Sequence, residues 1–191
     1  MQSLTGSASP TTSYLITLAD DASGQPGLSA YFVAGPILTQ YMALGGPAGS
    51  LGYPLANATA GARQNFQNGS LAGTPVQLVS GAILTKWAAL GYESGATGSP
   101  TAAAAAFQTF RGTSGVSQAF QNALIVAASG GALAGQTYWV SGLVLAQYKS
   151  AGGASGNLGA PTNDEHNPQS VRHRRWIPYK PSAPSTPRWS C

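Results

Sequence analysis

The sequence predicts an α+β fold rich in β-strands, made of tandem repeats of a short helix followed by two or three short strands. Three observations predict it. A nine-residue segment occurs three times, as VAGPILTQY, VSGAILTKW and VSGLVLAQY, beginning at Val33, Val79 and Val140. Each copy runs to a Gly-x-Pro at the same distance, and a Gln-x-Phe segment recurs between copies. Self-similarity of this kind is typical of repeat architectures, in which a unit buries its apolar face only against its neighbours.

The first part of each unit reads as a helix and a turn. Apolar residues recur at helical spacing from Ile37 to Leu44, which predicts a short amphipathic helix of about three turns. Gly45-Gly46 ends this helix, because glycine accepts the left-handed conformation that follows a last helical turn. Gly52-Tyr53-Pro54 predicts a turn, since proline fixes φ and glycine tolerates a positive φ.

The second part of each unit reads as short strands bounded by Gly, Ser and Asn. Strands are predicted at 64–66, 124–126 and 138–140. The periods are 46 and 61 residues, and two insertions account for the longer one. Within the first insertion, Ala102 to Ala106 is a low-complexity run that we expect as a surface loop or a helical turn.

The repeats set the predicted boundaries. Leu15-Ile16 ahead of Tyr31-Phe32-Val33 resembles Leu124-Ile125 ahead of the third copy, so the frame extends to the start of the chain. We therefore expect an incomplete array, divided into the end of a preceding repeat (1–32), a first repeat (33–78), a second repeat with insertions (79–139), a truncated third repeat (140–165) and a tail (166–191).

The charge is concentrated in the tail. Residues 1–165 carry four basic and five acidic residues, whereas residues 166–191 carry five basic residues and no acidic one. A nucleic-acid-binding domain needs clustered Lys and Arg on its folded face, so no nucleic-acid partner is expected. The tail also contains no glycine, and we interpret it either as an Arg/Pro-rich extended linker or as an out-of-frame translation of the continuing repeat.

Targeting signals are absent from the sequence. No apolar run approaches the length of a transmembrane helix, and residues 1–4 begin no signal peptide. The only cysteine is Cys191, so no intrachain disulfide can form. We expect either a cytoplasmic protein or a piece of a longer exported protein located in the cell wall or outside the cell.

The repeated motifs resemble the LGFP tandem-repeat family. The family tetrapeptide occurs as Leu51-Gly52-Tyr53-Pro54 and Leu158-Gly159-Ala160-Pro161, and in a degenerate form as Thr97-Gly98-Ser99-Pro100. The resemblance covers about residues 13–165. It implies blades in a propeller-like arrangement and a place in the bacterial cell envelope, tethering a covalently fused hydrolase or acyltransferase domain to the wall. Fold and repeat identity alone do not establish function.

Aromatic residues fall into two predicted groups. Tyr41, Trp87 and Tyr148 share one helix position in the three units, so we expect them in the core. Exposed aromatic rings on loops can stack on sugar faces, whereas buried rings only pack. Four residues are therefore the candidate ligand-binding set: Tyr53, Tyr92, Trp139 and Arg63, the last by hydrogen bonding.

One acidic cluster could carry chemistry. Asp164 and Glu165, next to His166, could hold Ca²⁺ with carboxylate oxygens while the imidazole accepts a proton. Asp20 and Asp21 could add carboxylates to this metal site if the fold brings them close. The alternative interpretation of the cluster is a solvated turn after a proline.

These features lead to one functional hypothesis and two rivals. The first is a non-catalytic repeat module, without a cofactor, that binds bacterial envelope polysaccharide and anchors a fused catalytic domain. The second is a small Ca²⁺-assisted hydrolase of an ester or lactone, with Asp164, Glu165 and His166 as its catalytic residues. The third is a purely structural spacer.

Overall fold

The computed structural model describes residues 3–9, 12–20, 26–59 and 63–165, with side chains from residue 30 onward. Three sheets alternate with three helices along the chain. The first sheet contains β1 (Ser3–Ser9), β2 (Thr12–Asp20) and β3 (Pro26–Ala34), and the second contains β4 (Arg63–Phe66), β5 (Gly69–Ala72) and β6 (Gln77–Val79). The third contains β7 (Ala105–Gln108), β8 (Ser114–Ala119), β9 (Ala123–Gly130) and β10 (Thr137–Ser141). All strand pairs are antiparallel, and the fold is α+β as predicted.

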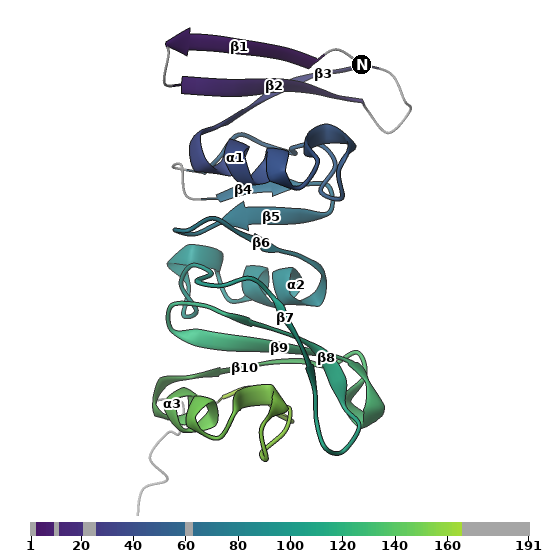
Figure 1. The fold of residues 1–191 in the computed structure, drawn as a ribbon, viewed down its shortest axis with the longest axis vertical. Helices are drawn as coiled ribbons and strands as arrows, with labels where there is room; N and C mark the ends of the chain where they lie inside the picture. The colour runs from purple at the N-terminus through teal and green to yellow at the C-terminus, as the bar shows by residue number, and fades with distance from the viewer. Residues whose placement is uncertain (1–2, 10–11, 21–25, 60–62, 166–191) are drawn as a thin grey trace, which may run out of the picture.

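The sheets and helices are stacked in one elongated column (Figure 1). Helix α1 (Gly35–Ala43) lies between the first two sheets, α2 (Gly81–Ala89) lies between the second and third, and α3 (Gly142–Ser150) follows the third. The predicted propeller-like arrangement is wrong for the described residues, which form no closed or propeller sheet. Helices α1 and α2 pack between successive sheets and α3 packs against the third, so the units follow one another along an axis instead of circling a central channel.

Glycines explain why the three helices begin and end alike. The three helices, each of nine residues, begin at a glycine with φ of +59°, +58° and +54°, at Gly35, Gly81 and Gly142. A left-handed glycine follows each helix, as predicted for Gly45, which has φ of +96°. A 3₁₀ turn comes next in each unit, namely η1 (Gly46–Ala48), η2 (Tyr92–Ser94) and η4 (Gly153–Ser155).

The predicted strands are present, and one predicted loop is partly a strand. Residues 64–66 lie in β4, 124–126 in β9 and 138–140 in β10. Val33 pairs with Leu15 and Val140 pairs with Leu124, so the first sheet follows the same frame as the third. The run from Ala102 to Ala106 was expected to be a loop or a helical turn, but its last two residues begin β7. Backbone pairing with β8 decides this local structure, and the alanine composition alone does not indicate it.

The core consists of one cluster of buried residues for each helix. The first contains Val33, Ile37, Tyr41, Leu51, Phe66 and Leu71, which come from β3, α1, the following turn and the next sheet. The second repeats this composition around Ile83, Trp87 and Phe120. The third surrounds Tyr148 and takes Phe107 from β7, so the inserted hairpin packs against the last unit.

Candidate functional site

The aromatic residue of each helix fastens the helix to its Gly-x-Pro turn. The Tyr41 hydroxyl donates to the carbonyl of Gly52 at 2.7 Å, and Trp87 Nε1 donates to that of Gly98 at 3.0 Å. Tyr148 repeats the contact with Gly159 at 2.6 Å. All three side chains are buried, which confirms the prediction that they belong to the core. Burial raises the pKa of both tyrosines to about 12, with the neighbouring Tyr53 adding to the effect at Tyr41.

The glutamine of each Gln-x-Phe segment joins its own sheet to the last strand of the preceding sheet and to the loop after the Gly-x-Pro turn. Gln64 Nε2 donates to the carbonyls of Phe32 and Ala56, at 3.0 and 2.9 Å. In the second unit, Gln118 Nε2 donates to the two equivalent carbonyls, those of Leu78 and Ala102. Both glutamines are buried. The Gln-x-Phe motif is therefore structural, because its amide satisfies carbonyls that would otherwise be buried without a partner.

A second glutamine covers the glycine of each complete Gly-x-Pro turn. Gln67 Oε1 accepts a hydrogen bond from the backbone N–H of Tyr53, and Gln121 Oε1 accepts one from that of Ser99, both at 3.0 Å. A Cβ at Gly98 would lie 2.5 Å from Gln121 Oε1. Its φ of +70° favours glycine at this position, and a Cβ would in addition force the Gln121 amide to move from its bond with Ser99.

Two of the predicted ligand-binding residues contact each other. The Arg63 guanidinium carbon lies 3.8 Å from the centre of the Tyr92 ring, and Arg63 Nε is 2.9 Å from Glu93 Oε2. The Tyr92 ring also meets Trp87 edge-on, at 5.1 Å between centroids. Arg63 comes from β4 and Tyr92 from η2, so this cation–π and ionic contact connects the sheet of one unit to the helical turn of the next.

The other two predicted residues lie apart from this pair. Tyr53 is half-buried in the first Gly-x-Pro turn, where its backbone bonds Gln67. Trp139 is half-buried in β10 and packs against the second core cluster. A ligand-binding role for Tyr53, Tyr92, Trp139 and Arg63 remains a prediction.

The acidic residues Asp164 and Glu165 bind backbone groups of the third unit. Asp164 Oδ1 accepts from the N–H of Trp139 at 3.2 Å, while its Oδ2 lies 2.6 Å from Lys86 Nζ. Glu165 Oε2 accepts from both the N–H and the hydroxyl of Ser141, the residue that precedes α3. A carboxylate there is stabilised by the dipole of the helix N-terminus.

The structure does not assemble the predicted metal site from described residues. Asp20 ends β2 in the first sheet, whereas Asp164 follows α3 in the chain, and these two elements lie at opposite ends of the column (Figure 1). Asp21 and His166 lie outside the described residues. Within the described ranges, no group of three His, Cys, Asp or Glu side chains is close enough to hold an ion. The roles proposed for Asp164 and Glu165 in metal binding or catalysis remain predictions, and their observed contacts favour a structural role, in which they hold the segment after Pro161 against β10 and α2.

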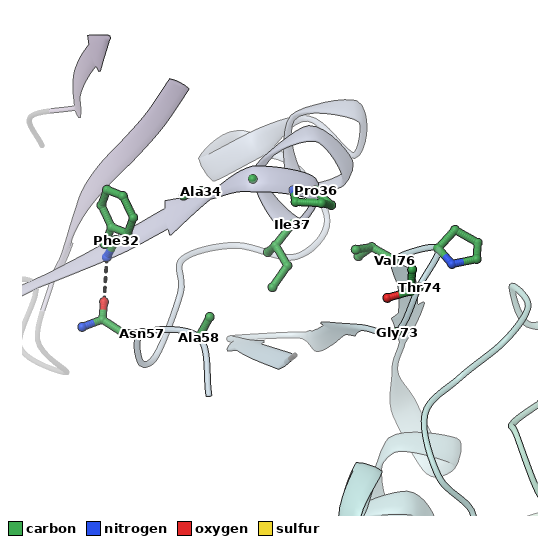
Figure 2. A pocket seen from close by; sticks show the side chains of 11 residues that line it. Phe32, Ala34, Pro36, Ile37, Asn57, Ala58, Gly73, Thr74 and Val76 are labelled. Carbon is green, nitrogen blue, oxygen red and sulfur yellow. Dashed lines mark hydrogen bonds between the residues drawn. The ribbon is translucent and has the colours of Figure 1, made fainter. Parts of the chain in front are cut away.

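A cavity that the sequence analysis missed lies in the first unit, between α1 and the second sheet. Its volume is about 560 Å³, and its walls come from the end of β3, the start of α1 and the β5–β6 turn. Figure 2 shows the ring of Phe32 at one end, Thr74 with Val76 toward the other, and Pro36 and Ile37 between them. The lining is mostly apolar, and the side chains of Asn57 and Thr74 supply polar atoms.

Two features of the cavity bear on ligand binding. The Phe32 side chain is 46% exposed although it is aromatic. Its backbone N–H donates to Asn57 Oδ1 at 2.8 Å, so the asparagine is held against the backbone of Phe32 (Figure 2). A signal in the sequence could have indicated this contact, because Asn57 follows Pro54 by the same three residues that separate Asp164 from Pro161.

Comparison with known proteins bears on the repeat itself. The family model of the LGFP repeat matches residues 51–95, which include the first Gly-x-Pro turn, the second sheet and α2. No curated protein matches the chain. None of the helices in the described part of the chain has the length and apolar character needed to cross a bilayer. LGFP repeats are typical of cell-envelope proteins. Residues 51–95 of this chain are an LGFP repeat.

Proposed function

We propose that this chain is a non-catalytic module that binds bacterial envelope polysaccharide, with the cavity beside Phe32 as its main contact. The observation that carries the proposal is a half-exposed aromatic ring at the edge of a largely apolar cavity. Sugar rings have apolar faces that stack on aromatic rings, and their hydroxyls need nearby polar partners. The Asn57 amide and the Thr74 hydroxyl are the polar groups available in this cavity.

A second contact is proposed at Trp139, toward the other end of the column from the first sheet. Trp139 occupies the position in the third unit that Phe32 occupies in the first, one residue before the valine of the nine-residue segment. The backbone N–H of each aromatic residue bonds to the side chain of Asn57 or Asp164. A polymer of repeating sugars can use both positions at once, so weak contacts gain by avidity. Tyr53, half-buried in the first turn, is a further proposed contact.

The location of the protein follows from the same proposal. A module of this kind belongs in the cell wall or outside the cell, and it would hold a fused catalytic domain close to the wall polymer. The Ca²⁺-dependent hydrolase is not proposed, because both carboxylates on which it depends already bind backbone groups.

The test is a pull-down of the full chain with bacterial sacculi. Sacculi that carry their attached polysaccharide should retain the protein saturably, and the same sacculi stripped of polysaccharide by mild acid should not. Phe32→Ala should weaken binding about three- to tenfold through loss of ring stacking. Phe110→Ala is the matched control, because Phe110 is fully exposed on the hairpin between β7 and β8.

Two results would count against the proposal. Equal retention on intact and stripped sacculi would show that polysaccharide is not the ligand. Loss of binding in Phe110→Ala, with Phe32→Ala unchanged, would exclude the cavity as the site.

A further inference from the structure

The third unit exposes a surface that the first two units bury. Ile37 and Ile83 occupy equivalent helix positions and are 5% and 2% exposed, whereas Val144 at that position in α3 is 55% exposed. Leu51 is 1% exposed in the first Gly-x-Pro turn, and its third-unit counterpart Leu158 is 66% exposed. The compared side chains are similar in size, so a change of size does not account for these differences in exposure.

The exposed surface borders a cavity of about 520 Å³. It is lined by Val140, Val144, Tyr148, Leu158 and the segment 159–165. The first-unit equivalents of the four named side chains are Val33, Ile37, Tyr41 and Leu51. They belong to the first core cluster, where Phe66 and Leu71 of the next sheet pack among them. We call this lined surface of the third unit the C-terminal socket.

The backbone of the third turn is also arranged to pair with a strand. In the first unit, the Tyr53 carbonyl accepts from the N–H of Gln67, and the Leu51 carbonyl accepts from that of Asn68, at 2.9 and 3.1 Å. The second unit repeats both bonds with Gln121 and Asn122. Among the described residues, no strand makes these bonds with the equivalent Ala160 and Leu158 of the third unit.

We propose that the C-terminal socket binds, in trans, a three-stranded β-meander of the Gln-x-Phe-Gln-Asn type presented by another LGFP-type polypeptide. The phenylalanine would fill the apolar cavity, and the first glutamine would donate to backbone carbonyls at the edge of the socket. The backbone of the Gln-Asn pair would hydrogen-bond to the Gly-x-Pro turn of the third unit. The internal contacts of Gln64, Phe66, Gln67 and Asn68 are the template for each of these interactions.

The sequence disfavours two other occupants of the socket, which are residues 166–191 of this chain and the first sheet of a second copy. Residues 166–191 contain no phenylalanine and no Gln-x-Phe. The first sheet of a second copy is also a poor match. Strand pairing makes Thr5 the counterpart of Asn65, which places Leu4 and Gly6 where the meander needs Gln and Phe.

The test uses the full chain and a synthetic peptide of residues 63–80, the meander of the first unit, as the probe. Fluorescence anisotropy of the labelled peptide should rise saturably with protein concentration. A peptide with Gln64→Ala and Phe66→Ala should bind at least about tenfold more weakly, because it loses the buried ring and the amide donor.

Variants of the protein show whether the peptide occupies the socket. Val144→Asp combined with Leu158→Asp should weaken binding at least about tenfold, because the peptide would bury both charges. Both side chains are exposed, so the variant should fold, and circular dichroism checks this. Leu55→Asp is the matched control, since Leu55 is an exposed leucine of the first unit.

Three outcomes would overturn the proposal. The first is the absence of saturable binding of the labelled peptide at protein concentrations up to about 1 mM. The second is equal binding by the socket variant, which would mean that the peptide displaces the chain's own meander elsewhere. The third is self-association of the full chain that the socket variant abolishes, since the occupant would then be a second copy.

Discussion

Replacing Tyr41 by phenylalanine tests whether the aromatic–glycine hydrogen bond holds each unit together. The Tyr41 hydroxyl donates to the Gly52 carbonyl at 2.7 Å, and the ring is fully buried. The substitution keeps the ring and removes only the donor, leaving the carbonyl without this partner. Loss of a buried partner costs about 1–3 kcal/mol. With an m-value of about 2 kcal/mol/M, the urea midpoint should fall by about 0.5–1.5 M at unchanged m.

The control is Tyr138→Phe. The Tyr138 hydroxyl makes an exposed bond of 3.3 Å with Gln136 Oε1, so its removal should change the free energy of unfolding by less than about 0.5 kcal/mol. Tyr148→Phe should resemble Tyr41→Phe, because its hydroxyl bonds Gly159 at 2.6 Å. A Tyr41→Phe midpoint equal to that of Tyr138→Phe would refute the assignment of a structural role to this bond.

Three further predictions follow from the same contacts. Burial holds the pKa of Tyr41 and Tyr148 at about 12, whereas the pKa of an unfolded tyrosine is about 10. Between these values the unfolded state binds fewer protons than the folded state, so the free energy of unfolding should fall as pH rises from about 10 to about 12. Urea midpoints measured across this range should fall less steeply with pH when both residues are phenylalanine. Gly98→Ala should destabilise by more than Gly112→Ala in thermal unfolding, because both have a positive φ but a Cβ at Gly112 meets nothing within 4 Å; equal effects would mean that the covering glutamine is not constrained. Asp164→Asn should cost less than about 1 kcal/mol in urea unfolding, because it keeps the acceptor and loses only a partly exposed ion pair, whereas Asp164→Ala should cost more.

The repeat register was predictable from the sequence because it is enforced by local geometry. Each helix begins at a glycine with positive φ and is followed by another, and few other residues adopt this conformation. The aromatic residue of the helix has to reach a carbonyl eleven positions later in the chain, and this fixes its spacing to the Gly-x-Pro turn. These constraints act within one unit, so they leave a periodic trace in the sequence.

The arrangement of the units and the site was less predictable, because both depend on contacts between units. Whether repeats form a column or a ring is set by the packing of sheets against helices, which a short amphipathic pattern does not specify. The contact of Arg63 with Tyr92 links β4 to the next unit, and it occurs once in the described chain. The acidic pair at 164–165 resembled a metal site by residue type, yet the repeat frame places Asp164 at the position of Asn57, which also bonds a backbone N–H.

The division between repeated and varied positions indicates where specificity for a ligand should lie. Positions filled by the same kind of side chain in every complete unit already have internal partners: the helix aromatic, the motif glycine and the two glutamines. Substitution there would damage the fold before it changed any affinity. The position before the repeated valine differs, being Phe32, Leu78 and Trp139, and it borders a cavity in the first unit. Leu78 and Trp139 pack against core clusters, so this position has to keep a large apolar side chain. Exchange among large apolar side chains there can change binding specificity while the column is kept.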